Sequence, residues 1–177
     1  LHDAHARRAV SSNPMPQTGT WEAQGTTTNG ATYAKKLFAT TYTDGYFRSY
    51  VNLAAGYTRP VNVLRYRTGA DVSLGYLYVT TTGQLALRND IGAVTTTSTT
   101  NFTAGSWHSL ELHLAVNGTS SSTEVWLDST KVNDLSLTNQ NWGTTPIGKV
   151  QIGEVQTGRT YSVSFDDVAF DTQRVGQ

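Results

Sequence analysis

The sequence predicts an all-β fold, a two-sheet antiparallel jelly-roll sandwich, and two observations support this prediction. Apolar and polar residues alternate with period two in one segment after another, which is typical of strands that place one face on a core. Turn-forming residues separate these segments at short intervals, and no stretch shows the apolar spacing of a helix. About ten short strands arranged in this way favour a sandwich over a design of alternating strands and helices.

Each expected strand ends at a turn signal. The expected strands span residues 32–40, 45–54, Val61–Thr68, Leu74–Thr80, Leu85–Asn89, Trp107–Val116, Thr123–Leu127, Lys131–Leu135, Ile147–Glu154 and Arg159–Phe170. Pairs such as Arg59-Pro60 and Thr82-Gly83 divide them, because Pro and Gly favour the backbone angles of turns. The clearest alternation places Leu110, Leu112 and Leu114 on one face of a strand, which predicts that this face lies on the core.

Size and charge limit the classes of function. The 177 residues fit one domain, 1–177, since a chain of this length buries roughly 70% of its unfolded surface. We expect residues 1–20, which carry Pro14 and Pro16 and little pattern after Val10, to form an extended arm.

The 13 Lys and Arg balance the 13 Asp and Glu, and this argues against a nucleic-acid partner, whose phosphates call for a basic surplus. The sequence has no cysteine and no apolar run of about 18 residues, so disulfides and membrane insertion are not expected.

Two motifs carry a resemblance to a known family. Trp107–Leu112 followed by Thr123–Asp128 resembles the core of concanavalin A-like lectin/glucanase (laminin-G-like) domains, and the closer similarity is to jelly-roll modules of bacterial secreted proteins. Further similar stretches are Val63–Thr68, Leu85–Asp90, Thr144–Gly148 and Tyr161–Val168. The resemblance covers residues 30–172 and implies a secreted or cell-surface bacterial setting. Because one such sandwich hosts lectins, adhesion domains, lyases and glucanases, the function has to be read from the site.

No catalytic residues are expected. Glucanases of this fold carry several carboxylates on one strand, because one group attacks while another protonates the leaving oxygen. Glu111 and Glu124 stand singly on alternating strands, and we interpret each as a solvent-facing charge. The histidines form no helical pair of zinc ligands, so a zinc hydrolase is not expected. His108, which shares the apolar face of its strand, is interpreted as a packed histidine.

Arginines and tyrosines in mid-strand positions form the main candidate for a ligand site. The residues predicted to bind a ligand on these strands are Arg48, Tyr50, Arg65, Arg67, Tyr76, Tyr78 and Arg88. If their strands are neighbours, they would line a groove for an extended, acidic polysaccharide, since guanidinium groups pair with carboxylates and aromatic faces stack on sugars. The alternative is that the arginine stems cover apolar surface and their charges pair with Asp71 or Asp90.

Two tryptophans are added to the predicted ligand site. Trp126 alternates with Val125 and Leu127, so it is expected to point away from the core, and Trp142 lies in a polar loop. An exposed tryptophan is a suitable platform for a sugar ring. Packing over a sheet edge is the alternative for Trp142.

Asp166 and Asp167 are adjacent acidic residues in the last expected strand. The resemblance implies a structural Ca²⁺ at this place, held by oxygen ligands from the strand and from an acidic residue near the N-terminus. The short Phe-Glu-x-Gly strand that opens such modules is not found here, and the usual Asp-Gly turn reads Asp128-Ser129. A hydrogen-bonded β-bulge at Asp166 and Asp167 is the alternative.

The sequence therefore favours a non-catalytic carbohydrate-binding, lectin-like module for a polysaccharide. A second hypothesis is a self-assembling or adhesion subunit, because loss of the first strand would leave an open sheet edge that accepts a strand from another copy. Residues 1–20 would then be the donor. A polysaccharide lyase or glucanase is the third hypothesis, although no residues for its chemistry can be placed.

Overall fold

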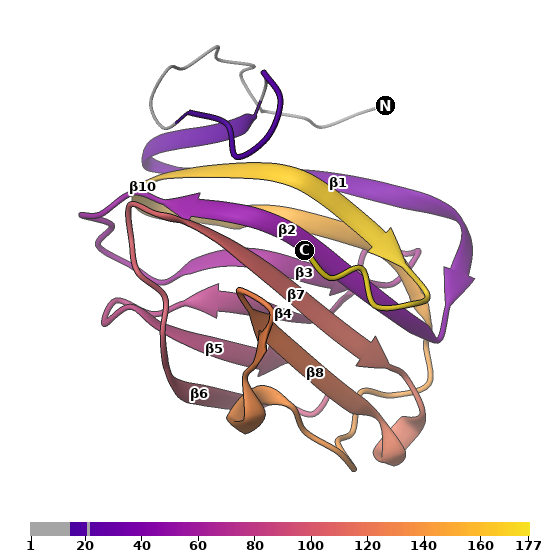
Figure 1. Ribbon diagram of the computed structural model, residues 1–177. Helices are drawn as coiled ribbons and strands as arrows, with labels where there is room; N and C mark the ends of the chain where they lie inside the picture. The colour runs from indigo at the N-terminus through magenta and orange to yellow at the C-terminus, as the bar shows by residue number, and fades with distance from the viewer. Residues whose placement is uncertain (1–14, 21) are drawn as a thin grey trace.

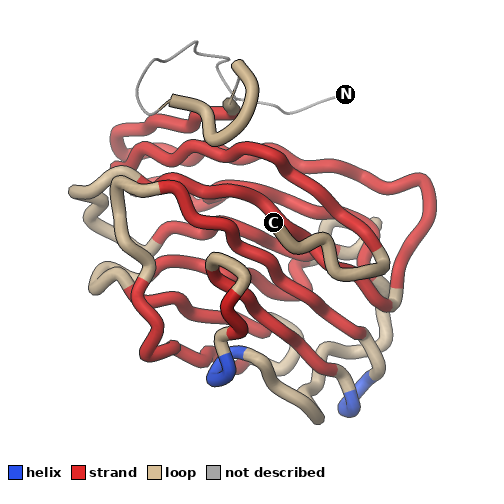
Figure 2. The backbone as a smooth tube through the Cα atoms, viewed as in Figure 1, coloured by secondary structure: helices blue, strands red, loops and turns tan. Residues whose placement is uncertain are grey.

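The predicted all-β antiparallel fold is confirmed by a computed structural model, which describes residues 15–20 and 22–177 (Figure 1). The strands are β1 (Ala23–Tyr42), β2 (Asp44–Leu53), β3 (Val61–Arg67), β4 (Ser73–Val79), β5 (Gln84–Asn89), β6 (Val94–Asn101), β7 (Trp107–Ala115), β8 (Ser122–Leu127), β9 (Thr130–Lys131) and β10 (Ile147–Asp171). The helical segments of the described residues are two short 3₁₀ turns, η1 (Gly118–Ser120) and η2 (Asn133–Leu135) (Figure 2). Neither is long and apolar enough to cross a membrane.

The strands form one curled sheet whose two halves face each other. The order is β6-β5-β4-β3-β10-β2-β7-β8-β9, with β1 beside β10. Residues 149–152 of β10 pair with β3, whereas residues 163–171 pair with β2. We call the half that contains β3, β4, β5, β6 and the start of β10 the β3 sheet, and the half that contains β2, β7, β8, β9 and the end of β10 the β2 sheet. The long strands β1 and β10 run along both halves and join them (Figure 1).

Glycines allow β10 and β1 to stay paired while they bend. Gly153 and Gly158 have φ angles of +81° and +78°, in a region that side chains with a Cβ rarely adopt. A Cβ on Gly153 would lie 2.4 Å from the backbone oxygen of Thr32 on β1, so no other residue fits at this close approach.

The core lies between the two sheets, and alternation along each strand supplies its side chains. Leu64 and Leu77 are register partners that face inward from the β3 sheet, and Leu110 and Leu112 face them from β7; all four are fully buried. The hydroxyl group of Tyr66 crosses the core and lies 2.8 Å from the Gly45 oxygen and 2.7 Å from the Leu112 oxygen. The core face predicted from the sequence is therefore confirmed.

Three expected strands differ from those observed. The segment Lys131–Leu135 contains only the end of β9 and the 3₁₀ turn η2, and the two expected strands from Ile147 to Phe170 are one continuous strand. Strand β6 was not predicted, because its Thr and Ser side chains show no apolar alternation. It forms because it pairs with β5 at the end of the sheet, where few apolar side chains are needed.

The prediction that the first strand is missing is wrong. β1 begins at Ala23, not at residue 32, and its first part pairs with the end of β10 from Ala23 opposite Phe165. The edge proposed for strand exchange is therefore occupied by the chain's own β1. Of the expected arm, residues 1–14 lie outside the described residues, and the carbonyl of Met15 accepts a hydrogen bond from Trp107 Nε1 at 2.8 Å.

Candidate functional site

A row of polar side chains crosses the outer face of the β3 sheet. The row is built by direct register partners on neighbouring strands: Lys35 opposite Gln151, Gln151 opposite Arg65, Arg65 opposite Tyr76, and Tyr76 opposite Arg88. We call these five residues the cross-strand row. They share one face because residues in register on adjacent strands point to the same side of a sheet.

Polar groups on this face are unusually buried. Arg65 is 6% exposed, Arg67 8% and Gln151 1%, although they lie on the outer side of the sheet. Charged side chains are rarely this buried unless they are paired. The side chains of this face therefore shield one another, and such a packed polar array suits the ordered presentation of groups to a ligand.

Gln151 holds Arg67 in place. Arg67 donates from Nε to Gln151 Oε1 at 2.7 Å and from Nη1 to the Asp71 carbonyl at 2.8 Å, and Gln151 donates from Nε2 to the Gly153 carbonyl at 3.1 Å. Gln151 was not predicted as a site residue, since a single Gln in a strand carries no signal of its own. Only the pairing of β10 with β3 reveals its place in the cross-strand row.

Arg65 at the centre of the row is incompletely paired. Its guanidinium carbon lies 4.1 Å from the centre of the Tyr76 ring, and Nη1 donates to Ser73 Oγ at 3.3 Å. Its Nε is buried without a hydrogen-bond partner, and within the described residues Arg65 forms no ion pair. Burial lowers the pKa of Arg65, and the nearby charge of Arg67 lowers it further. An anion at this place would relieve both effects.

The other cations of this face are held by the chain's own carboxylates. Asp71 lies 2.8 Å from Lys35 Nζ, 3.4 Å from Lys149 Nζ and 3.8 Å from Arg67 Nε. Burial alone would raise the pKa of Asp71, but these cations outweigh burial and hold the pKa below its usual value.

At the far end of the row, Arg88 Nε lies 3.1 Å from Asp90 Oδ1. The alternative interpretation of the arginines, pairing with Asp71 and Asp90, is thus correct for Arg67 and Arg88. It does not apply to Arg65, whose guanidinium has no carboxylate within ion-pair distance among the described residues.

Two tyrosines and a buried carboxylate complete the face. The rings of Tyr76 and Tyr78 lie 5.7 Å apart and are tilted by 54° to each other. Beside them, the fully buried Glu154 accepts from Asn62 Nδ2 at 3.2 Å and lies 3.2 Å from Arg159 Nε. An open hollow of about 370 Å³ adjoins Arg159 at the bend of β10.

Arg48 and Tyr50 do not join this face, so the predicted convergence of Arg48 with Arg65 and Arg88 is wrong. β10 lies between β2 and β3, and the curled sheet places the outer face of β2 on the opposite side of the sandwich. There Arg48 stands opposite Glu111 in register, with its guanidinium carbon 5.3 Å from the Tyr50 ring centre.

Neither predicted tryptophan is an exposed platform. Trp142 is 1% exposed and packs against Gly75, where a Cβ would lie 2.4 Å from the Trp142 ring. Its loop folds over the end of the core, so the polar neighbours in the sequence were misleading. Trp126 does lie on the outer face of the β2 sheet, but it is 8% exposed, with Arg174 4.5 Å above its ring.

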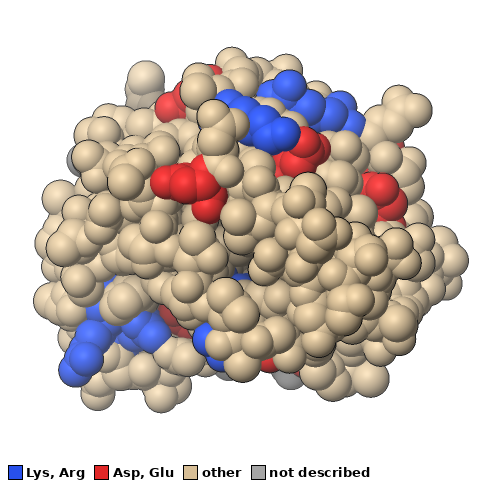
Figure 3. All heavy atoms as spheres, turned by 90° about the horizontal axis from the view of Figure 1, so that it is seen from below, with Lys and Arg blue, Asp and Glu red and all other residues tan. Residues whose placement is uncertain are grey.

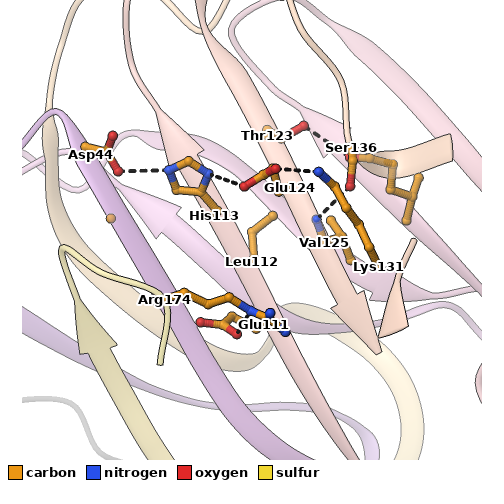
Figure 4. Close-up of polar contacts among 12 residues, drawn as sticks. Asp44, Glu111, Leu112, His113, Thr123, Glu124, Val125, Lys131, Ser136 and Arg174 are labelled. Carbon is orange, nitrogen blue, oxygen red and sulfur yellow. Dashed lines mark hydrogen bonds and ion pairs between the residues drawn. The ribbon is translucent and has the colours of Figure 1, made fainter. Parts of the chain in front are cut away.

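Figure 4 shows a separate polar network on the outer face of the β2 sheet. His113 Nε2 lies 2.8 Å from Asp44 Oδ1, and His113 Nδ1 lies 3.3 Å from Glu124 Oε2. Glu124 also accepts from Lys131 Nζ at 2.5 Å, and Lys131 holds the pKa of Glu124 below its usual value. This network joins β2, β7, β8 and β9 and has a structural role.

Glu111 is buried, so its interpretation as a solvent-facing charge is wrong. It is 2% exposed because the C-terminal segment crosses its strand, with the backbone N–H of Val175 donating to Glu111 Oε1 at 2.7 Å. Arg174 Nε lies 3.5 Å from Glu111 Oε2. The C-terminal segment thus covers part of the β2 sheet (Figures 1 and 4).

The acidic pair Asp166 and Asp167 forms a β-bulge, as the alternative interpretation predicted. The register with β2 shifts after Asp166, and Asp167 has a φ angle of 46°. Thr18 donates from its backbone N–H to Asp166 Oδ2 at 3.0 Å and from its hydroxyl to Asp167 Oδ2 at 2.9 Å. Within the described residues, no group of three or more His, Asp and Glu side chains is arranged to hold a metal ion.

An acidic residue near the N-terminus nevertheless lies beside this pair. Glu22 accepts from Ser164 Oγ at 3.1 Å, while its Oε2 is buried without a partner. Burial raises the pKa of Glu22, and the nearby charge of Asp166 raises it further. The signal in the sequence was Trp21-Glu22 three residues before Gly25, a variant of the opening motif that was expected and not found.

Figure 3 shows where charged side chains lie at the open end of the sandwich. Seen from the open end of the sandwich, most of the surface is neither acidic nor basic, and Lys and Arg form separate groups at opposite edges of the view (Figure 3).

Comparison with known proteins shows the fold. No protein-family model and no curated protein sequence matches this chain. Among solved structures, the chain is similar to the cellulose induced protein Cip1 with a TM-score of 0.72 and 18% sequence identity, over 91% of this chain and 84% of that one. It is also similar to the carbohydrate binding module CBM66 from Bacillus subtilis, with a TM-score of 0.55 and 14% identity over 84% and 86% of the two chains.

A third similar structure is only partly covered. The sialidase of Trypanosoma rangeli in complex with the inhibitor DANA gives a TM-score of 0.68 and 13% identity over 92% of this chain, but the match covers 27% of the sialidase. These identities are low, so the similarities establish a β-sandwich fold shared with such domains and no more.

Proposed function

We propose that this domain binds an acidic polysaccharide on the outer face of the β3 sheet. The observation that carries the proposal is Arg65, a buried cation at the centre of the cross-strand row with an unpartnered Nε and no carboxylate of its own. A carboxylate of a uronic acid would accept hydrogen bonds from this guanidinium. Tyr76 and Tyr78 would supply aromatic surface for sugar rings beside it.

The comparisons support a carbohydrate ligand. One similar structure is a carbohydrate binding module, and another is a cellulose induced protein; both are matched over most of their length. A carbohydrate-binding module meets its polysaccharide outside the cell, so we infer that this domain is secreted or located at the cell surface. The preference for an acidic polymer rests on the arginines of the β3 sheet.

Affinity electrophoresis in gels that contain one polysaccharide at a time would test the proposal. We expect polyglucuronate to retard the protein strongly and cellulose derivatives without charge to retard it weakly. Binding should weaken as salt rises, because a guanidinium–carboxylate contact is partly electrostatic. Equal retardation by neutral and acidic polymers, or none by either, would contradict the proposal.

We also propose that the domain binds without cleaving its ligand. A lyase needs a base to remove a proton beside the uronate carboxylate, and burial raises the pKa of Tyr76, which makes its phenolate a poor candidate at neutral pH. The two histidines that the structure describes, His108 and His113, lie on β7 in the other sheet. We expect no rise in ultraviolet absorbance from unsaturated uronates during incubation with polyglucuronate. Such a rise would assign a lyase instead.

A structural Ca²⁺ is proposed beside the bulge in β10. Glu22, Asp166 and Asp167, which do not form a preformed metal site in the described residues, would have to converge to supply carboxylate oxygens to this ion. Calcium prefers six to eight oxygen ligands, so backbone or water oxygens would complete its shell. The buried, unpartnered Oε2 of Glu22 next to the charge of Asp166 is the observation that favours a cation there.

The raised pKa of Glu22 predicts how the stability of the protein should change with pH, and this change tests the calcium proposal. A carboxyl group whose pKa is raised in the folded state costs stability above its unfolded pKa, so without calcium the protein should lose stability as pH rises from about 4.5 through the raised pKa. We expect Glu22→Gln to remove this loss. Calcium should raise the melting temperature of the wild type at pH 7 and leave that of Glu22→Gln unchanged. An equal response of both proteins would contradict the site.

Self-assembly is retained as a second candidate, at a different edge. β1 forms one edge of both sheets, opposite β6 and β9, and pairs only with β10 among the described strands, so its other side could accept a strand from a second copy. Light scattering over a range of concentrations would reveal a dimer or a larger assembly. A monomer at every concentration would end this candidate.

A further inference from the structure

The cations of the cross-strand row are regularly spaced. Lys35, Arg65 and Arg88 lie on every second strand, with Gln151 between the first two and Tyr76 between the last two. Neighbouring strands are ~4.8 Å apart, so the positions of these cations repeat at about 10 Å perpendicular to the strands. Two sugar units of an extended β-1,4-linked chain span a similar distance.

We propose that the ligand is an extended polysaccharide that crosses the strands of the β3 sheet and presents a carboxylate to the row at every second sugar. This inference rests on the proposed function and adds the direction of the chain and the repeat of its charges. In a chain with two-fold symmetry, alternate sugars face the same side. A polymer with a uronate at every sugar and one with a uronate at every second sugar therefore offer the row the same set of carboxylates.

The chain's own carboxylates mark the two ends of this row. Asp71 pairs with Lys35 and Asp90 pairs with Arg88, whereas Arg65 between them has no such partner within the described residues. The side chains of Asp71 and Asp90 are 39% and 27% exposed, so each pair is accessible to a competing carboxylate. Exposed ion pairs contribute about 0–1 kcal/mol, and a ligand carboxylate can therefore replace them.

The repeat is tested by calorimetry with three oligosaccharides of equal length. One carries a glucuronate at every sugar, one alternates glucuronate with N-acetylglucosamine, and one carries a glucuronate at every fourth sugar. We expect the first two to bind with similar affinity and the third to bind at least about tenfold more weakly, because it loses charge-assisted contacts at the outer cations.

A matched pair of variants on β1 tests the same point. Lys35→Gln should weaken binding of the alternating oligosaccharide, while Lys36→Gln should not, because the next residue of a strand points to the other face.

Asp90→Asn and Asp71→Asn release Arg88 and Lys35 and should each tighten binding by up to about fivefold. Asn is suited to position 71, where φ is 70°.

The outcomes separate this inference from the proposed function. The proposed repeat of charges is wrong if all three oligosaccharides bind equally well and more tightly than an uncharged cello-oligosaccharide. It is also wrong if Lys36→Gln weakens binding as much as Lys35→Gln does. In both cases the proposal that the domain binds an acidic glycan stands. If none binds more tightly than the uncharged oligosaccharide, the proposed function itself is wrong.

Discussion

Replacing Arg65 with Gln is expected to weaken binding of a glucuronate oligosaccharide by about 10- to 100-fold, because hydrogen bonds to charged groups contribute about 1.5–3 kcal/mol. Arg65 is the central cation of the cross-strand row and has no ion-pair partner among the described residues, so a ligand carboxylate would not have to displace a carboxylate of the protein from it. Arg65→Lys should fall between Arg65→Gln and the wild type, since an ammonium group keeps the charge but loses the planar fork. Isothermal titration calorimetry at low and high salt measures both effects.

Arg48→Gln is the matched control for this loss. Arg48 also lies beside a tyrosine ring and also has buried, unpartnered nitrogens, but it lies on the outer face of the β2 sheet. We expect it to leave the affinity unchanged. If Arg48→Gln weakens binding as much as Arg65→Gln does, the ligand lies elsewhere or the two arginines act only through the net charge.

Replacing Trp142 with Ala is expected to lower the free energy of unfolding by about 3–5 kcal/mol, as for other large buried aromatic side chains. The Trp142 ring is 1% exposed and fills the space above Gly75 on β4. Urea denaturation followed by circular dichroism measures the loss. Glycan affinity at low temperature, where the variant is still folded, should be unchanged.

Trp142→Phe keeps the prediction testable if Trp142→Ala does not fold, because a smaller ring leaves part of the packing in place. Gly75→Ala should also destabilise the protein, since its Cβ would lie 2.3 Å from the Arg88 backbone oxygen and 2.4 Å from the Trp142 ring. A Trp142 variant with normal stability and lost affinity would show instead that this ring contacts the sugar.

The local sequence pattern was sufficient to predict most strands, because apolar and polar residues must alternate along a strand that buries one face. It failed for β6, whose Thr and Ser side chains need no apolar face where the strand ends the sheet. It also failed at the bend of β10, where Gly158 and polar neighbours suggested a turn. The positive φ of the glycines allows the strand to continue there, and pairing with β1 maintains it.

The sequence could group site residues correctly only where strands that are neighbours in the sheet also follow one another in the sequence. Arg65, Tyr76 and Arg88 lie on consecutive hairpin strands, and they are brought together as expected. Arg48 was grouped with them because its strand comes just before β3, but β10 inserts between the two strands. Gln151 was missed for the same reason: the pairing of a distant strand leaves no local signal.

The most direct test of the central claim is a nuclear magnetic resonance titration of the ¹⁵N-labelled protein with a glucuronate oligosaccharide. The side-chain Nε–Hε signals of Arg65 and Arg88 and the backbone amides of β3, β4, β5 and the start of β10 should shift, while the signals of β7 and β8 stay in place. Shifts confined to β7 and β8, or spread over both outer faces, would contradict a glycan site on the β3 sheet.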